Sequence, residues 1–96
     1  MQIKSDYLDF IVNTIKKYIP NSKIYFFGSR VAGNASQYSD LDVAVSQNEP
    51  IKLSILSEIK EIFAESDIPF KIDLIDFNKV DQEFQKIIES HAKCED

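Results

Sequence analysis

The chain has 96 residues, 44% of them hydrophobic, and its 16 acidic residues outnumber its 11 basic ones, which gives a net charge of −5. This length suits one domain with one modest core, so we expect residues 1–96 to form a single domain. The acidic balance disfavours a general nucleic-acid binder, because such proteins gain affinity by neutralising phosphates with a basic surface.

The cysteine content and the apolar runs exclude further classes. Cys94 is the single cysteine, which rules out a disulfide framework or a thiolate metal site and is typical of a reducing cytoplasm. The first ten residues carry no apolar segment of the signal-peptide type, and no run reaches the length of a membrane span. We therefore expect a soluble, cytoplasmic protein that does not associate with membranes.

The first half of the chain predicts a helix followed by two strands. Residues 5–19 carry an apolar stripe at helical spacing, with Ser5 as the N-cap and a stop at Pro20. The run KIYFF over 23–27 is typical of a buried strand that ends at Gly28. A helical turn and loop are expected over 29–39, and a second strand over 40–45.

The second half predicts a helix, a strand and a final helix. Pro50 marks the start of the second helix, and residues 70–77 form the third strand. The last helix has Asn78 as its N-cap and an apolar face made of Val80, Phe84, Ile87, Ile88 and His91. This order predicts an α/β (α+β) fold, a small sheet with helices against it, while the pairing of the first two strands stays open.

The second strand carries a pair of carboxylates, Asp40 and Asp42. Side chains at positions i and i+2 of a strand point to the same face, so these two project together while Leu41, Val43 and Val45 point into a core. Two neighbouring carboxylates repel each other, and a bound divalent cation removes that conflict. Mg²⁺ prefers oxygen ligands and is usually held by one or two carboxylates plus substrate phosphates, so the pair predicts a metal site.

A third carboxylate is available on the next strand. Asp73 joins Asp40 and Asp42 if its strand pairs beside theirs, and three carboxylates suffice for one or two Mg²⁺ ions in a phosphoryl transfer. Asp73 is also a candidate acceptor for the proton of an attacking hydroxyl. Asp76 competes for this role, but its odd spacing turns it to the other face, where it ends the strand. Lys71 is either a surface lysine or a phosphate contact.

A glycine-serine pair precedes the carboxylates. Gly28 follows a strand, so the chain can turn tightly and bring backbone N–H groups close to a phosphate. Ser29 can donate its hydroxyl to the same phosphate, and Arg30 supplies a guanidinium for phosphate oxygens or a salt bridge to a carboxylate. Each of these features alone is a weak signal, whereas their combination with Asp40, Asp42 and Asp73 is strong.

This combination resembles the nucleotidyltransferase superfamily that includes DNA polymerase beta. The superfamily signature is Gly-Ser, a spacer, Asp-x-Asp and a later acidic residue, which appear here as GSRVAGNASQYSDLD and then KIDLID. Within it the chain is similar to the minimal nucleotidyltransferases, because Arg30, Gly33 and Ser39 fit the fuller pattern of that group. The match covers essentially the whole chain.

The resemblance implies a fold and an activity. It implies a mixed sheet flanked by helices, nucleotide binding by Gly28, Ser29 and Arg30, and catalysis and Mg²⁺ binding by Asp40, Asp42 and Asp73. It further implies an antitoxin that transfers AMP from ATP to a tyrosine of a partner toxin, a HEPN-type ribonuclease.

Two alternatives remain open at this point. The first is a binding module that neutralises the toxin by contact alone, and the second is transfer to a small molecule or an RNA end. The short acidic chain favours an acceptor that is itself a protein, because enzymes with other acceptors need additional structure to hold them.

Overall fold

The computed structural model describes residues 3–28 and 40–95. Within these ranges the secondary-structure elements follow one another in this order: α1 (Ser5–Tyr18), β1 (Lys23–Phe27), β2 (Leu41–Ser46), α3 (Leu53–Ala64), β3 (Ile72–Asp76), the 3₁₀ turn η1 (Phe77–Lys79), α4 (Gln82–His91) and β4 (Lys93–Glu95).

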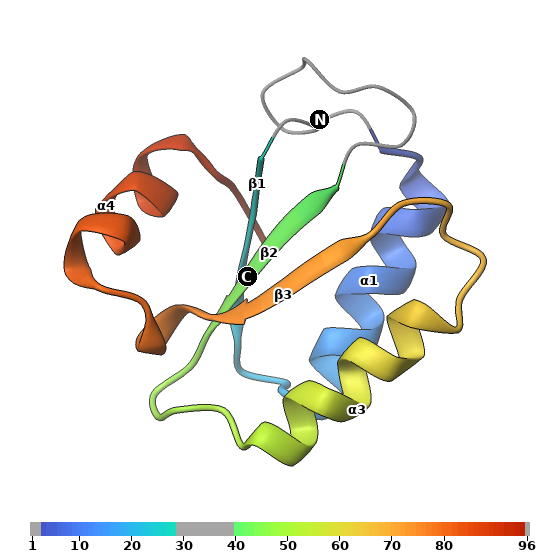
Figure 1. Cartoon of the computed structure of the whole chain (residues 1–96), viewed down its shortest axis with the longest axis horizontal. Helices are drawn as coiled ribbons and strands as arrows, with labels where there is room; N and C mark the ends of the chain where they lie inside the picture. Colours follow the sequence, from blue (N-terminus) through green and yellow to red (C-terminus); the bar gives the residue numbers. More distant parts are fainter. Residues whose placement is uncertain (1–2, 29–39, 96) are drawn as a thin grey trace.

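The strands of the described residues form one mixed sheet in the order β3-β2-β1-β4. Strand β1 pairs antiparallel with β2 and β4, whereas β2 and β3 run parallel. Helices α1 and α3 cover one face of the sheet and α4 lies over the other (Figure 1). The predicted α+β class, a small mixed sheet flanked by helices, is confirmed.

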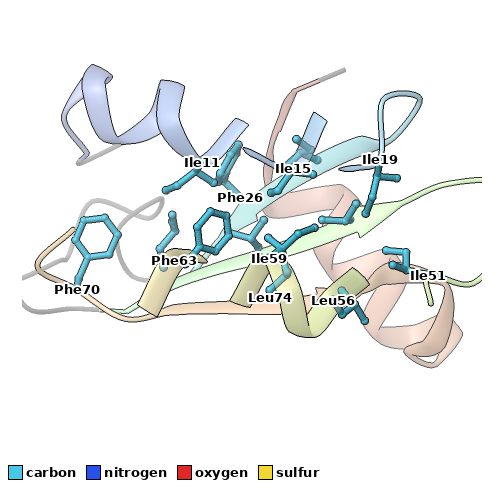
Figure 2. Packing of buried hydrophobic residues seen from close by; sticks show 14 residues of the cluster. Ile11, Ile15, Ile19, Phe26, Ile51, Leu56, Ile59, Phe63, Phe70 and Leu74 are labelled. Carbon is cyan, nitrogen blue, oxygen red and sulfur yellow. The ribbon is translucent and has the colours of Figure 1, made fainter. Parts of the chain in front are cut away.

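The larger core lies between the sheet and the pair α1 and α3. Every second residue of β2 points into it, and Leu41, Val43 and Val45 are each 0% exposed, as the alternation predicts. Figure 2 shows Ile11 and Ile15 of α1, with its C-cap residue Ile19, on one side of this core and Leu56, Ile59 and Phe63 of α3 on the other. The opposite side chains of β2 are thereby left to face α4.

A smaller core lies between the sheet and α4. Tyr25, Ala44, Phe77 and Ile88 form it, and the ring of Tyr25 stacks on that of Phe77 at 4.9 Å between centroids. Tyr25, Ala44 and Ile75 are register partners across β1, β2 and β3, so they form one row of the sheet. Helix α4 covers this row. The next row on the same face contains Asp42 and lies beside the edge of the helix.

The expected elements are present, with differences at their ends. Strand 23–27 has the predicted bounds, but α1 begins at Ser5 with Lys4 as N-cap, and α3 begins at Leu53 rather than at Pro50. The prediction that Asn78 caps the last helix is wrong, because Asp81 is the N-cap of α4 and accepts a hydrogen bond from Phe84 N.

The C-terminal strand and residues 29–39 need separate mention. Strand β4 was not expected, because a run of three residues near the end of the chain gives no detectable period. The expected turn over 29–39 and the side chain of His91 lie outside the described residues. In the described ranges, the helices are too short or too polar to cross a membrane.

Candidate active site

Asp42 and Asp73 lie side by side in the sheet. They are register partners in the parallel pair β2 and β3, and Phe27 of β1 is the partner of Asp42 on its other side. Directly paired residues share a face of the sheet, so Phe27, Asp42 and Asp73 form one row on the face that α4 covers only in part. The expectation that Asp73 comes from a neighbouring strand is thus met by parallel pairing in register.

Asp42 occupies an environment that opposes its ionisation. The pKa of Asp42 is raised above its ordinary value of 3.8, first by burial of the carboxyl, then by the negative charges of Asp73 and Asp40, and also by a hydrogen bond with Asp73. Half of the Asp73 side chain remains open to solvent, with 46% exposed. Two carboxylates are therefore held together at a place where burial and like charge oppose the ionisation of Asp42.

Asp40 lies apart from this pair. It immediately precedes β2 and is exposed, although its charge still raises the pKa of Asp42. Across residues 3–28 and 40–95, no group of three or more His, Cys, Asp or Glu side chains is arranged to hold a metal ion. The structure thus brings together two of the three predicted carboxylates and places the third nearby at the edge of the strand.

The donor set of this pair fits Mg²⁺. That ion is commonly bound through one or two carboxylates and completes its octahedron with water and phosphate oxygens. Asp42 and Asp73 supply two carboxylates on one face, and their repulsion decreases when a cation lies between them. A complete cage of protein ligands is therefore not needed.

Gly28 closes the site at the end of β1. Its φ of +97° lies in the region that favours glycine. A Cβ at this position would lie 2.6 Å from Asp42 Oδ2, too close for any real contact. The turn of the backbone favours glycine here, and a larger residue would displace the carboxylate beside it.

Two charged neighbours have distinct places. Lys71 Nζ lies 3.5 Å from Asp73 Oδ1, so a cation borders the pair at the surface. Asp76 is only 5% exposed and accepts hydrogen bonds from Ile51 N at 2.8 Å and Asn78 N at 3.0 Å. As expected from its spacing, Asp76 is turned away from Asp73, and it ends the strand by capping η1.

Sequence reasoning missed the aromatic side chains of the site. Phe27 and Phe84 were assigned to the core, yet both line a concavity of about 280 Å³ together with Asp42 and Asp73. Phe27 lies two residues after Tyr25 on β1, so both side chains occupy the same face of the sheet, and pairing with β2 makes this the face of Asp42. Ser29 and Arg30, the other predicted nucleotide-binding residues, lie outside the described residues.

This arrangement of a mixed sheet, a glycine turn and paired carboxylates on adjacent strands defines a nucleotidyltransferase of the polymerase beta type. Residues 10–94 match the family model described as polymerase beta, nucleotidyltransferase, and the chain belongs to this family. The predictions of family and of enzyme class, a nucleotidyltransferase, are confirmed.

Individual relatives are consistent with this family. The chain is 38% identical over 88 residues to a protein of Haemophilus influenzae named probable protein adenylyltransferase MntA. The aligned region covers 92% of this chain and 77% of the relative. It is similar in fold to a crystal structure of a toxin-antitoxin with AMP-PNP, with a TM-score of 0.77, 24% identity, and coverage of 90% of this chain and 69% of the other.

A third comparison gives the same fold. A variant of the toxin-antitoxin MntA-HpeT matches with a TM-score of 0.76 and 23% identity, over 98% of this chain and 72% of the other.

Proposed function

We propose that this protein is a Mg²⁺-dependent antitoxin that transfers AMP from ATP to a tyrosine hydroxyl of a partner toxin of the HEPN type. Residues 1–96 would act as one minimal nucleotidyltransferase domain in the cytoplasm, where ATP is available. The observation that carries the proposal is the in-register pairing of Asp42 with Asp73 beside Gly28. The relative named probable protein adenylyltransferase supports the choice of AMP and of a protein acceptor.

The proposed reaction makes one bond and breaks one. The acceptor oxygen attacks the α-phosphorus of ATP, and the bond from that phosphorus to the oxygen bridging to the β-phosphate breaks. AMP becomes esterified to the acceptor, pyrophosphate leaves, and the hydroxyl proton passes to a carboxylate or to water. No redox partner is required.

The residues of this chain divide these tasks. Asp40, Asp42 and Asp73 would hold the metal, which would offset the charge of the phosphates and of the leaving pyrophosphate. The Asp73 side chain is 46% exposed and is suited to accept the proton of the incoming hydroxyl. Gly28 leaves room for the backbone to approach the phosphates, and Ser29 and Arg30 would contact phosphate oxygens.

Metal binding can be tested on the protein alone. Mg²⁺ with the inert nucleotide α,β-methylene-ATP should raise the melting temperature of the wild type, because ligands that bind the folded state stabilise it. The increase should be lost in Asp42→Asn. An equal increase in both proteins would contradict the proposed metal site.

The transfer is tested on the partner. The family resemblance directs the search for it to the product of the neighbouring gene, and its intact mass is measured after incubation with this protein, Mg²⁺ and ATP. We expect one or more AMP units to be added. AMP-PNP should also serve as donor, since only its β–γ bridge is altered, whereas α,β-methylene-ATP should not. An unchanged partner mass, with ATP intact and both proteins folded, would refute the proposal.

Neutralisation by binding alone is the second candidate. The carboxylates Asp40, Asp42 and Asp73 argue against it, because a protein that acts by contact alone has no need of side chains that repel one another. Asp42→Asn separates the two functions because it removes a carboxylate without changing the size of the side chain. If the variant still protects cells from the toxin but transfers no AMP, contact is sufficient; if protection is lost while association persists, transfer is required.

A further inference from the structure

A concavity opens between the carboxylate row and helix α4. Its volume is about 280 Å³, and its lining combines Asp42 and Asp73 with four apolar side chains: Phe27, Leu74, Ile75 and Phe84. The carboxylates border this concavity directly, so a group that enters it reaches the proposed site of chemistry.

An aromatic pair lines the concavity together with the carboxylates. Phe27 of β1 and Phe84 of α4 meet edge to face, with ring centroids 6.0 Å apart and an angle of 82° between the planes. Phe84 is 37% exposed, so much of its ring is not covered by the chain itself. Such a ring offers a stacking surface to a second aromatic group.

The first turn of α4 fixes the position of Phe84. Its backbone N–H donates to Asp81 Oδ1 at 2.8 Å, and the next residue, Gln85, donates from Nε2 to Phe77 O at 2.9 Å. The first bond is the N-cap bond of the helix itself, and the second ties the start of the helix to the preceding turn η1. The aromatic pair is therefore set in place before any ligand binds.

The chemistry of the lining selects among aromatic ligands. Among the residues that the structure describes, the polar side chains lining the concavity are Asp42 and Asp73, which accept hydrogen bonds when ionised and donate none. Adenine can donate from its amino group to a carboxylate, but its several ring-nitrogen acceptors find no donor among these side chains. A phenol has one hydroxyl that donates to a carboxylate, and the rest of its ring is apolar.

We propose that the concavity between Phe84 and Asp73 binds the ring of an acceptor tyrosine, with the tyrosine hydroxyl directed toward Asp73. Phe27 and Phe84 then determine the preference for an aromatic over an aliphatic hydroxyl. This inference rests on the proposed function. It places the acceptor on the Asp73 side of the site, away from Gly28.

Binding is tested by NMR titration of the isotope-labelled protein with N-acetyl-L-tyrosinamide. We expect shifts centred on Phe27, Ile75 and Phe84. Loss of one aromatic contact in Phe84→Ala should weaken binding by about threefold to tenfold. Phe84→Leu, which keeps an apolar side chain and the fold, should fall between the two. Leu53→Ala is the matched control, because Leu53 is a 70% exposed apolar residue of α3, on the other side of the sheet.

Two other ligands identify the occupant. N-acetyl-L-phenylalaninamide should bind more weakly than the tyrosine derivative, because it offers no hydroxyl to Asp73. Adenosine should leave the Phe84 signals unchanged. The inference is overturned if adenosine shifts these signals more than N-acetyl-L-tyrosinamide does, or if Phe84→Ala and Phe84→Leu bind the latter as the wild type does.

Transfer to the partner separates this inference from the proposed function. If the wild type modifies the partner and both Phe84 variants do so at the same rate, the acceptor concavity is refuted while the function stands. If N-acetyl-L-tyrosinamide binds as expected but no AMP is transferred to any partner, the function is refuted and the concavity remains an aromatic site.

Discussion

The carboxylate of Asp42 fills the space into which any side chain at Gly28 would project. A Cβ at Gly28 would lie 2.6 Å from Asp42 Oδ2 and 3.3 Å from its carboxyl carbon. The glycine turn and the carboxylate therefore constrain each other. The carboxylate is the end of a flexible side chain, so it can move away from an added methyl group, but only by leaving its position beside Asp73.

Gly28→Ala should therefore impair transfer more than stability. The positive φ of Gly28 costs alanine about 1 kcal/mol of unfolding free energy. Displacement of the Asp42 carboxylate by as little as 1 Å should lower the rate of AMP transfer by about 100-fold. Both quantities are measured on the same preparation, by denaturant unfolding and by partner modification.

The Asp42→Ala background provides the control for this variant. With the carboxylate gone, the clash disappears, and Gly28→Ala should retain only the cost of its backbone conformation. A transfer rate for Gly28→Ala close to that of the wild type would show that the contact with Asp42 does not constrain the site.

Asp42→Asn should stabilise the protein in the absence of metal. Because the pKa of Asp42 is raised in the folded state above its ordinary 3.8, the ionised carboxylate destabilises the fold at neutral pH. This destabilisation decreases as the pH falls through the raised pKa of the folded state, and it is lost below 3.8, where the carboxyl is protonated in both states. Removing one of two opposed like charges should raise the unfolding free energy by up to about 1 kcal/mol at neutral pH.

The measurement is denaturant unfolding in EDTA across this pH range. The gain in Asp42→Asn over the wild type should shrink with acidification. Asp9→Asn, which removes the same charge from an exposed position of α1, should change stability less. A gain that is constant with pH would mean that repulsion at Asp42 is not its cause.

Lys71→Ala should have a small effect that depends on Asp73. The Lys71 side chain is 70% exposed, and its 3.5 Å contact with Asp73 is screened by water. We expect a loss of at most about 0.5 kcal/mol, which should decrease with added salt. In the Asp73→Asn background the loss should vanish. A double-mutant cycle measures this coupling, and an unchanged loss in that background would rule out the ion pair as its source.

Asp76→Ala should cost far more stability than any change at the carboxylate pair. It leaves the buried Ile51 N–H and the Asn78 N–H without their acceptor, which should lower the unfolding free energy by about 2 to 3 kcal/mol. Asp81→Ala removes one exposed cap of α4 and should cost only about 1 kcal/mol. Chemical denaturation measures the loss of unfolding free energy in both variants. A larger loss in Asp81→Ala than in Asp76→Ala would contradict the structural role of Asp76.

The sequence predicted the parts of this fold that depend on strong periodicity. The alternation in 40–45 identified Leu41, Val43 and Val45 as core, and the odd spacing of Asp73 and Asp76 placed these two side chains on opposite faces of the sheet. These predictions hold because a period of two fixes which face a side chain occupies.

Other features depend on tertiary contacts that no local pattern encodes. The pairing of the first two strands was left open, since their short connection is compatible with either direction. Asp73 was expected beside Asp42 only if their strands pair, and the sequence does not give that register. Phe84 fits an apolar helical stripe, and only the position of α4 at the margin of the sheet shows that its ring remains partly exposed. Similarly, Asn78 resembles a helix cap, but its side chain instead donates to Gln47 O at 2.6 Å.

The central claim is that Asp42, paired with Asp73, carries nucleotide transfer. The most direct measurement compares AMP incorporation into the partner by the wild type, Asp42→Asn and Asp9→Asn, at equal concentrations and with folding verified. We predict that incorporation is abolished in Asp42→Asn and unchanged in Asp9→Asn. Incorporation by Asp42→Asn at the wild-type rate would contradict the claim.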